Sequence, residues 1–338
     1  MRLMIHADSY RRLRDEITAA APDAELVLVD PDGTIRAGGG EVLDPTDARP
    51  QVAWANADVF LGPAARPYLT AALKSPDLQW VQSGAAGVDD PVFRQIIDKG
   101  ARLTTSHGQA LGIADYVLWG VLDHFQKGPE RRAAQQRGEW AKRPFREIAG
   151  SRWTLVGFGA IGQAVAARAK AFGARVTGLK RSAAPHPAAD LVAPMAQVLK
   201  HLSDADVVVL CCPLSAETRH IADAGFFAAM KPGSVLVNVG RGGLVDEPAL
   251  LAALDRGAPE HAVLDVFEVE PLPADSPFWR HPRVNLNAHA SGITEGMAAR
   301  NDQIFLENLK RYAAGEPLLH EADPADVRAG AGTGQTGV

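Results

Sequence analysis

Three polar residues of different chemistry follow one another in the second half of the chain: Arg241, Glu270 and His289. They lie downstream of a glycine-rich turn at residues 157–162. A guanidinium can hold a carboxylate and polarise a carbonyl, an imidazole can pass a proton, and a carboxylate can orient the imidazole. Beside a nicotinamide, these groups could reduce a 2-keto acid. Taken singly, each has an ordinary alternative: a surface charge, the end of a segment or a buried histidine.

The glycine-rich turn has the spacing of a dinucleotide-binding motif. Residues 153–156 predict a strand and residues 160–172 a helix, so the glycines lie where a strand passes into a helix. There Gly157 can make the tight turn, Gly159 can let the backbone approach a pyrophosphate, and Gly162 can let the helix pack on the strand. The alternative is an ordinary glycine-rich turn. The predicted cofactor contacts are Gly157, Phe158, Gly159, Ala160, Ile161 and Gly162.

The second predicted strand, residues 175–179, indicates which cofactor binds. A site for NAD usually places Asp or Glu at its end to bind the ribose 2′-hydroxyl, but here Lys180, Arg181 and Ser182 follow. A guanidinium can grip a 2′-phosphate, supported by the lysine charge and the serine hydroxyl. The sequence therefore predicts NADP in preference to NAD, with NAD still possible. An exposed Lys-Arg pair on a solvated face is the alternative.

Composition sets wider limits. A chain of 338 residues predicts two domains, and a net charge of −5 without a long basic run argues against nucleic acid or an anionic membrane as partner. No apolar stretch could span a bilayer and the N-terminus lacks the form of a signal peptide, so we expect a cytoplasmic protein. The adjacent Cys211 and Cys212 suit neither a structural disulfide nor a metal site, and we expect buried, reduced thiols beside the cofactor and no bound metal.

Alternating strands and helices predict an α/β fold of two domains, each a parallel sheet flanked by helices. The larger is predicted to be a Rossmann dinucleotide-binding domain. The expected strands before the turn are residues 3–5, 26–29, 59–61 and 78–81, with a helix at 91–99. After the turn we expect strands at 175–179, 207–211, 234–239, 262–265 and 284–287, a helix at 295–314, and a disordered tail at 323–338.

Five segments together resemble the D-isomer-specific 2-hydroxyacid dehydrogenase family over nearly the whole chain: residues 83–89, 157–162, 238–247, 264–273 and 289–292. The resemblance implies two α/β domains with cofactor and substrate in the cleft. It also implies a homodimer built largely by the cofactor domains. The chain of such proteins crosses into the cofactor domain near a helix like 113–127, and the last helix returns. The implied substrate-binding domain is 1–110 with 293–322, and the implied NAD(P)-binding domain is 111–292.

The resemblance also implies roles for single residues. Arg241 would hold the substrate carboxylate, His289 would donate the proton and Glu270 would orient His289. Asp265 would contact the nicotinamide carboxamide. The residue before the histidine is often Pro in the family and is Ala288 here, so the local backbone could differ. The further implied contacts are Ala85, Ala86 and Gly87 with the substrate carboxylate, and Cys212, Pro213, Val239 and Gly240 with the cofactor.

Within this family, the end of the second strand most resembles NADP-preferring glyoxylate and hydroxypyruvate reductases. We therefore expect NADPH-dependent reduction of a small 2-keto acid to the D-2-hydroxy acid. Phosphoglycerate, phosphite or a larger keto acid, with NAD, remain alternatives. Formate is disfavoured because formate enzymes typically have Gln at the Glu270 position. A dinucleotide-sensing corepressor-like binding protein is a further alternative, which steady NADPH oxidation by keto acids would exclude.

Overall fold

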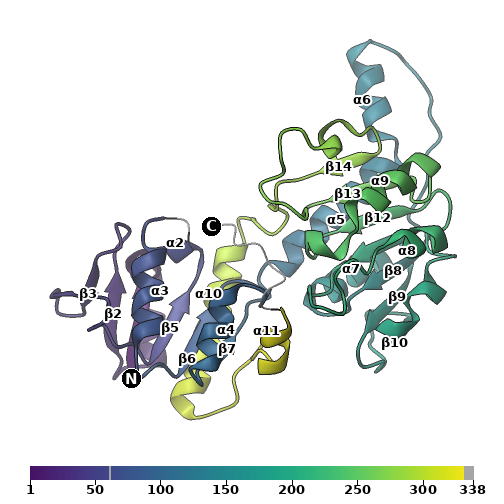
Figure 1. The fold of residues 1–338 in the computed structure, drawn as a ribbon. Helices are drawn as coiled ribbons and strands as arrows, with labels where there is room; N and C mark the ends of the chain where they lie inside the picture. Colours follow the sequence, from purple (N-terminus) through teal and green to yellow (C-terminus); the bar gives the residue numbers. More distant parts are fainter. Residues whose placement is uncertain (61, 331–338) are drawn as a thin grey trace. The chain divides into compact units, whose positions relative to one another are not determined.

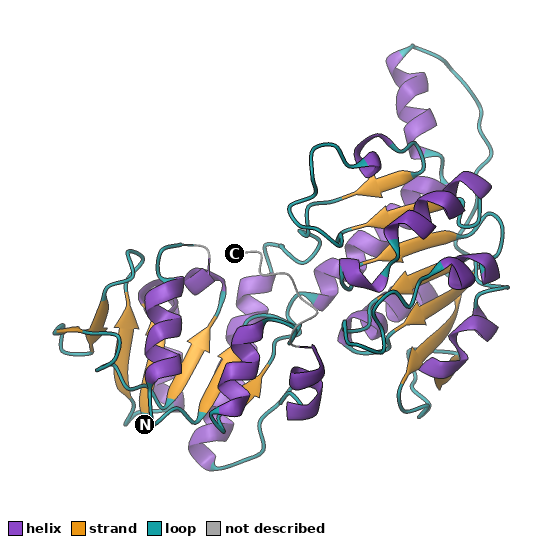
Figure 2. Ribbon diagram, viewed as in Figure 1, coloured by secondary structure: helices purple, strands orange, loops and turns teal. Residues whose placement is uncertain are grey.

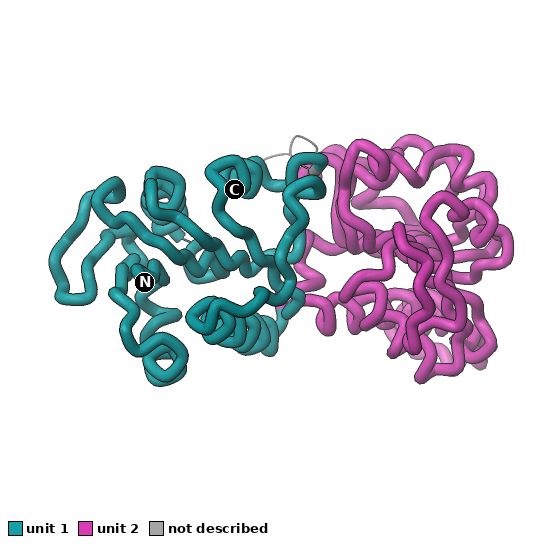
Figure 3. Tube along the Cα trace, turned by 90° about the horizontal axis from the view of Figure 1, so that it is seen from below, with its two compact units in different colours: residues 1–108, 294–336 teal, residues 109–293, 337–338 magenta. Residues whose placement is uncertain are grey.

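The chain folds as two compact units, each built on its own sheet (Figures 1 and 3). Our structure is a computed structural model that describes residues 1–60 and 62–330. Of the described residues, unit 1 contains those of 1–108 and 294–330, and unit 2 contains residues 109–293. Helices cover both faces of each sheet (Figure 2), which confirms the predicted α/β class.

Unit 2 has a fully parallel sheet with the strand order β10-β9-β8-β11-β12-β13-β14. The first strand of this unit in chain order, β8, therefore lies between β9 and β11, and the order of the strands reverses there. In such sheets ligands bind at the carboxyl ends of the strands beside this point. The strands are β8 (Arg152–Val156), β9 (Arg175–Lys180), β10 (Leu191–Pro194), β11 (Val207–Leu210), β12 (Val235–Asn238), β13 (His261–Leu264) and β14 (Val284–Leu286).

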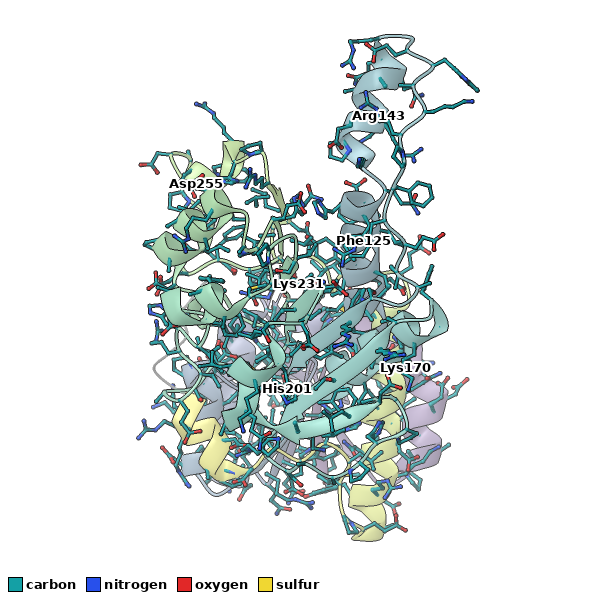
Figure 4. All side chains as sticks on the ribbon, turned by 90° about the vertical axis from the view of Figure 1, so that its right-hand side faces the viewer. Phe125, Arg143, Lys170, His201, Lys231 and Asp255 are labelled. Carbon is teal, nitrogen blue, oxygen red and sulfur yellow. The ribbon has the colours of Figure 1, made fainter. Side chains whose placement is uncertain are left out.

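Two helical layers bury this sheet, which explains why its central strand, β11, is apolar throughout. Every residue of β11 is buried, as expected for a strand covered on both faces. Helices α5 (Ala110–Phe125) and α7 (Ala160–Ala171) share a core on one side, and α8 (Ala224–Ala229) and α9 (Glu247–Arg256) on the other. Helix α6 (Gly128–Gln136) continues beyond the end of α5 and projects from the body of unit 2 (Figure 4).

Unit 1 has a sheet of the order β4-β3-β2-β1-β5-β6-β7, in which β3 and β4 pair antiparallel at one edge. Helix α10 packs on this sheet through Phe305, whose ring stacks on Trp54 at 4.8 Å. The strands are β1 (Arg2–His6), β2 (Glu25–Val29), β3 (Ile35–Ala37), β4 (Val42–Leu43), β5 (Val52–Ala55), β6 (Trp80–Ser83) and β7 (Arg102–Thr104). The helices are α1 (Ala7–Ala20), α2 (Ala57–Phe60), α3 (Ala65–Lys74), α4 (Pro91–Asp98), α10 (Met297–Ala314) and α11 (Pro324–Gly330).

Two local predictions are wrong. The strand expected at 59–61 is displaced: residues 52–55 form β5, whereas Val59 and Phe60 belong to α2 and donate to the carbonyl of Asn56. Leu61 lies outside the described residues. The tail expected to be disordered from 323 forms α11, because Val327 is fully buried against the core of unit 1. Residues 331–338 of that prediction lie outside the described chain. No described helix is both long and apolar enough to cross a membrane.

Candidate active site

The glycine-rich turn lies where β8 meets β11, at the reversal of strand order in unit 2. Gly157 has φ +103°, a conformation that residues with side chains rarely adopt. A β-carbon there would lie 2.5 Å from the backbone nitrogen of Cys212. Cys211 stabilises the turn because its thiol donates a hydrogen bond to the carbonyl of Gly157, with 3.0 Å between sulfur and oxygen. Only glycine therefore fits the first position of the turn.

The other two glycines have opposite surroundings. A β-carbon on Gly162 would lie 2.4 Å from the carbonyl oxygen of Gly157, so this glycine is needed for close packing. A β-carbon on Gly159 would meet nothing within 4 Å. Gly159 precedes the 12-residue helix α7, which has no side-chain cap at its N-terminus. An open backbone beside an uncapped helix start fits the pyrophosphate of a dinucleotide.

Phe158, between the first two glycines, is buried under β9. A β-carbon on Gly178, in the middle of β9, would lie 2.3 Å from the Phe158 ring. The edge of the ring meets His186 at a centroid distance of 5.5 Å. The phenyl group of Phe158 is therefore part of the core, and only the backbone of this predicted contact residue remains for a ligand.

The end of β9 carries the predicted selector of the cofactor. Lys180 is half-buried as the last residue of the strand, and Arg181 and Ser182 are exposed directly after it. The first carboxylate after β9 is Asp190, which accepts from Lys170 at 2.8 Å and from the backbone nitrogen of Val176 at 2.7 Å. This carboxylate is thus engaged at the start of the strand, far from the end that would receive a ribose.

The predicted histidine and glutamate form a direct pair. Nδ1 of His289 lies 2.8 Å from Oε2 of Glu270. Oε1 of Glu270 accepts from the backbone nitrogen of Phe267 at 2.9 Å, so both carboxylate oxygens are fixed. With its Nδ1 held in this way, the half-exposed His289 presents its other ring nitrogen, for which no partner is found among residues 1–60 and 62–330.

Arg241 is brought to the same place by a close backbone contact. A β-carbon on Gly242 would lie 1.8 Å from the carbonyl carbon of Phe267, so the loop after β12 rests directly on the loop that carries Glu270. Asn238 donates to the carbonyl of Arg241 at 2.9 Å, and Arg241 donates to the carbonyl of Gly240 at 2.8 Å. The structure therefore places the loops of all three predicted residues together.

The charges of this cluster set its protonation. The hydrogen bond that His289 donates to Glu270 raises the pKa of His289, although burial and the charge of Arg241 oppose the rise. Burial works to raise the pKa of Glu270, but the hydrogen bonds from His289 and Phe267 and the charges of His289 and Arg241 outweigh it, so this pKa is lowered. The contacts of the pair therefore favour a charged imidazolium on His289 and a carboxylate on Glu270.

A family model named "D-isomer specific 2-hydroxyacid dehydrogenase, NAD binding domain" matches residues 118–291, just over half of the chain. The chain belongs to this family. It is 36% identical to a glyoxylate/hydroxypyruvate reductase A of Serratia proteamaculans over 62% of this dehydrogenase and 67% of that relative. It is 32% identical to a D-3-phosphoglycerate dehydrogenase of Methanocaldococcus jannaschii over 72% of its own length, but spans only 47% of that protein.

A solved structure also resembles this dehydrogenase. The D-isomer specific 2-hydroxyacid dehydrogenase of Xanthobacter autotrophicus Py2, crystallised with NADPH and MES, is 30% identical and superposes with a TM-score of 0.76. The match covers 96% of this chain and 98% of that one. No cluster of His, Cys, Asp or Glu side chains that could hold a metal is found within the described parts of the dehydrogenase.

Asp265 holds the loop that carries His289, a role that the sequence did not reveal. His289 has φ +51°, which is unusual for a residue with a side chain. The carboxylate of Asp265, which is only 2% exposed, accepts from Asn287 at 2.8 Å, from the backbone nitrogens of Ala290 and Ser291 at 3.0 Å each, and from the Ser291 hydroxyl. These bonds fix the backbone on both sides of His289, where the expected proline is replaced by Ala288.

The loop predicted to bind the substrate carboxylate lies in unit 1, after β6. Ala85 already donates to the hydroxyl of Ser83 at 3.0 Å and accepts from the backbone nitrogen of Ser106 at 2.8 Å. Within the described chain, Ala86 and Gly87 donate no backbone hydrogen bond to another residue. Of the three predicted residues, these two retain free N–H groups.

Of the two cysteines predicted to be buried thiols, Cys212 is buried and Cys211 is partly buried. Both are free, and burial raises the pKa of Cys212 to about 12 and that of Cys211 still further. The side chain of Cys212 packs in the core of unit 2 and Pro213 is exposed beside it. Val239 is buried, and Gly240 has no room for a β-carbon because one would lie 2.7 Å from Leu244.

Proposed function

We propose that this dehydrogenase uses NADPH to reduce a small 2-keto acid of the glyoxylate or hydroxypyruvate type to the D-2-hydroxy acid. The 2.8 Å contact between His289 and Glu270, beside Arg241, carries the proposal. It supplies a proton donor next to a fixed cation, as ketone reduction requires. The activity for which the Serratia relative is named supports this substrate class. Phosphoglycerate, the substrate class of the Methanocaldococcus relative, is the second candidate.

In this proposal the chain binds the substrate through its carboxylate. Arg241 pairs with the carboxylate and polarises the C2 carbonyl, and the backbone N–H groups of Ala86 and Gly87 donate to the carboxylate oxygens. The nicotinamide, when bound, supplies a hydride to C2. His289 donates its proton to the carbonyl oxygen, and the neutral imidazole stays held by Glu270. In the reverse direction the neutral imidazole takes the proton back.

A panel of keto acids tests the activity. Glyoxylate, hydroxypyruvate, pyruvate, 2-ketobutyrate and phenylpyruvate would each be mixed with the enzyme and NADPH or NADH, and the loss of reduced cofactor followed by absorbance. We expect turnover of at least one short keto acid, and faster turnover with NADPH. Bound cofactor without turnover of any member would overturn the reductase assignment.

We propose NADP as the preferred cofactor because Lys180, Arg181 and Ser182 end β9, where a carboxylate would repel a 2′-phosphate. The turn of Gly157, Gly159 and the start of α7 would hold the pyrophosphate. The solved relative with bound NADPH supports this preference.

We also propose that the enzyme is a homodimer joined through unit 2. Helix α6 and the segment that returns from it project from the unit (Figure 4). Trp140, on this segment, is 96% exposed. A large exposed aromatic on a projecting arm is typical of a protein interface. We expect the wild type to sediment at twice its mass of 35.9 kDa and Trp140→Glu at the monomer mass. A wild-type monomer would contradict the proposal.

A further inference from the structure

The chain passes between the two units twice, at Gly108–Gln109 and at Ile293–Thr294. On the unit 1 side, one side chain near the start of α10 holds both crossings. Nε of Arg300 donates to the carbonyl of Gly108 at 2.7 Å, and NH2 of Arg300 donates to the hydroxyl of Thr294 at 3.2 Å. A planar guanidinium suits this double contact because its donors have a fixed geometry. Segments far apart in the sequence are thereby joined by one residue.

The next residue, Asn301, holds the first crossing more tightly. It is 4% exposed, and its Oδ1 accepts from the hydroxyl of Ser106 at 2.5 Å. A β-carbon on Gly108 would lie 2.0 Å from the same oxygen, so the crossing is pressed against the Asn301 side chain. Nδ2 of Asn301 faces the carbonyl of Gly84 at 3.4 Å. Asn301 therefore contacts both the crossing and the start of the predicted carboxylate loop.

The first crossing is also bonded to that loop directly. The backbone nitrogen of Ser106 donates to the carbonyl of Ala85 at 2.8 Å. On the unit 2 side the two crossings are again neighbours, because a β-carbon on Gly292 would lie 3.2 Å from Cβ of Gln109. A continuous set of contacts thus runs from the loop at 84–87 through the first crossing to the second.

We propose that Arg300 and Asn301 are positioning residues that hold both crossings in fixed register with the 84–87 loop. Backbone changes in two-unit enzymes concentrate in such crossing residues, so loosening them should also loosen the loop at 84–87 that is proposed to bind the substrate carboxylate. Neither residue has a place in the proposed chemistry. The kinetic part of this inference rests on the proposed function, whereas the restraint itself does not.

Gly296 offers a way to disturb the restraint without removing its charge. A β-carbon on Gly296 would lie 2.4 Å from NH1 of Arg300, so alanine would displace the guanidinium. The backbone of Gly296, at φ −85° and ψ −6°, is one that alanine adopts readily. Arg311 provides a matched control, since it lies on the same helix but pairs with Glu307 at 2.8 Å.

Hydrogen–deuterium exchange of the full-length enzyme tests the restraint. We expect Arg300→Met and Gly296→Ala to speed exchange at residues 106–109 and 292–296 by about ten-fold, the loss expected for charge-assisted hydrogen bonds. Arg300→Lys, which keeps a donor, should restore part of the protection. Arg311→Met should match the wild type at both crossings. Unchanged exchange at either crossing, or an equal change in Arg311→Met, would overturn the proposal.

Steady-state kinetics and NADPH titration test the consequence. We expect Arg300→Met to raise KM for the keto acid or lower kcat, with the NADPH dissociation constant unchanged because the predicted dinucleotide contacts lie in unit 2. If exchange at the crossings becomes faster in Arg300→Met while KM and kcat for the keto acid stay at wild-type values, the positioning role is overturned. If the wild type reduces no keto acid, the proposed function fails, and the exchange experiment still decides whether the restraint exists.

Discussion

His289→Ala should lose about 10² to 10⁴ in kcat/KM for keto-acid reduction at neutral pH, the usual contribution of a positioned acid. The variant should still bind NADPH, because His289 takes no part in the turn of Gly157 and Gly159. Some activity should remain, since positioning by Arg241 survives the change. Stopped-flow reduction with a fluorescence titration of NADPH would measure both quantities.

The pH dependence identifies the donor. Reduction needs the imidazolium, so kcat/KM should fall as pH rises through the pKa of His289, which Glu270 holds above the usual range. Glu270→Gln removes the carboxylate and should move this fall to lower pH. His289→Ala should flatten it. His107 is not a substitute near neutral pH, because burial and the neighbouring His320 lower its pKa to about 4. An unchanged profile in His289→Ala would place the donor elsewhere.

Arg181→Ala should raise KM for NADPH by roughly 5- to 150-fold, corresponding to about 1 to 3 kcal/mol for a charge-assisted contact. KM for NADH should change little, because NADH has no 2′-phosphate. The kcat of Arg181→Ala with NADPH should equal that of the wild type, since the 2′-phosphate is remote from the reacting carbon. Initial rates over a range of each cofactor give the comparison.

Arg175 is the control for this experiment because it is also exposed and lies at the opposite end of β9. Arg175→Ala should leave both KM values near those of the wild type. A wild type that prefers NADH, or equal losses with both cofactors in Arg181→Ala, would refute the role given to the end of β9.

The sequence predicted the central strands of unit 2 well, for a physical reason. Residues 207–210 are apolar without interruption because both faces of β11 are buried, and such a run has few other interpretations. Short edge strands carry no such pattern. The predicted strands omitted β3, β4, β7 and β10, none longer than four residues. The strand misplaced at 59–61 was an apolar run that forms a helical turn.

The site was less completely predictable. The order of Arg241, Glu270 and His289 indicated a reductive site, and the structure brings their loops together. The hydrogen bonds of Asp265 were not foreseeable, because Asn287 and Ser291 become its partners only when β13 and β14 pair. The available signal for these hydrogen bonds was the pair Asn285 and Asn287, two polar residues on the strand that leads to His289. They precede Ala288, which occupies the position of the expected proline, and Asn287 helps to hold the loop by donating to Asp265.

The contact between Phe158 and Gly178 makes the bulk at these two positions interdependent. Their combined volume has to be conserved, so a larger residue in β9 is compatible only with a smaller one in the turn. A chain that redistributed this volume would shift β9 against α7. The spacing between the glycine-rich turn, proposed to bind the pyrophosphate, and the end of β9, proposed to bind the adenosine ribose, would then change. Attempts to re-engineer cofactor choice at Arg181 should therefore leave this aromatic–glycine pair intact, because it sets the distance over which any selector residue must reach.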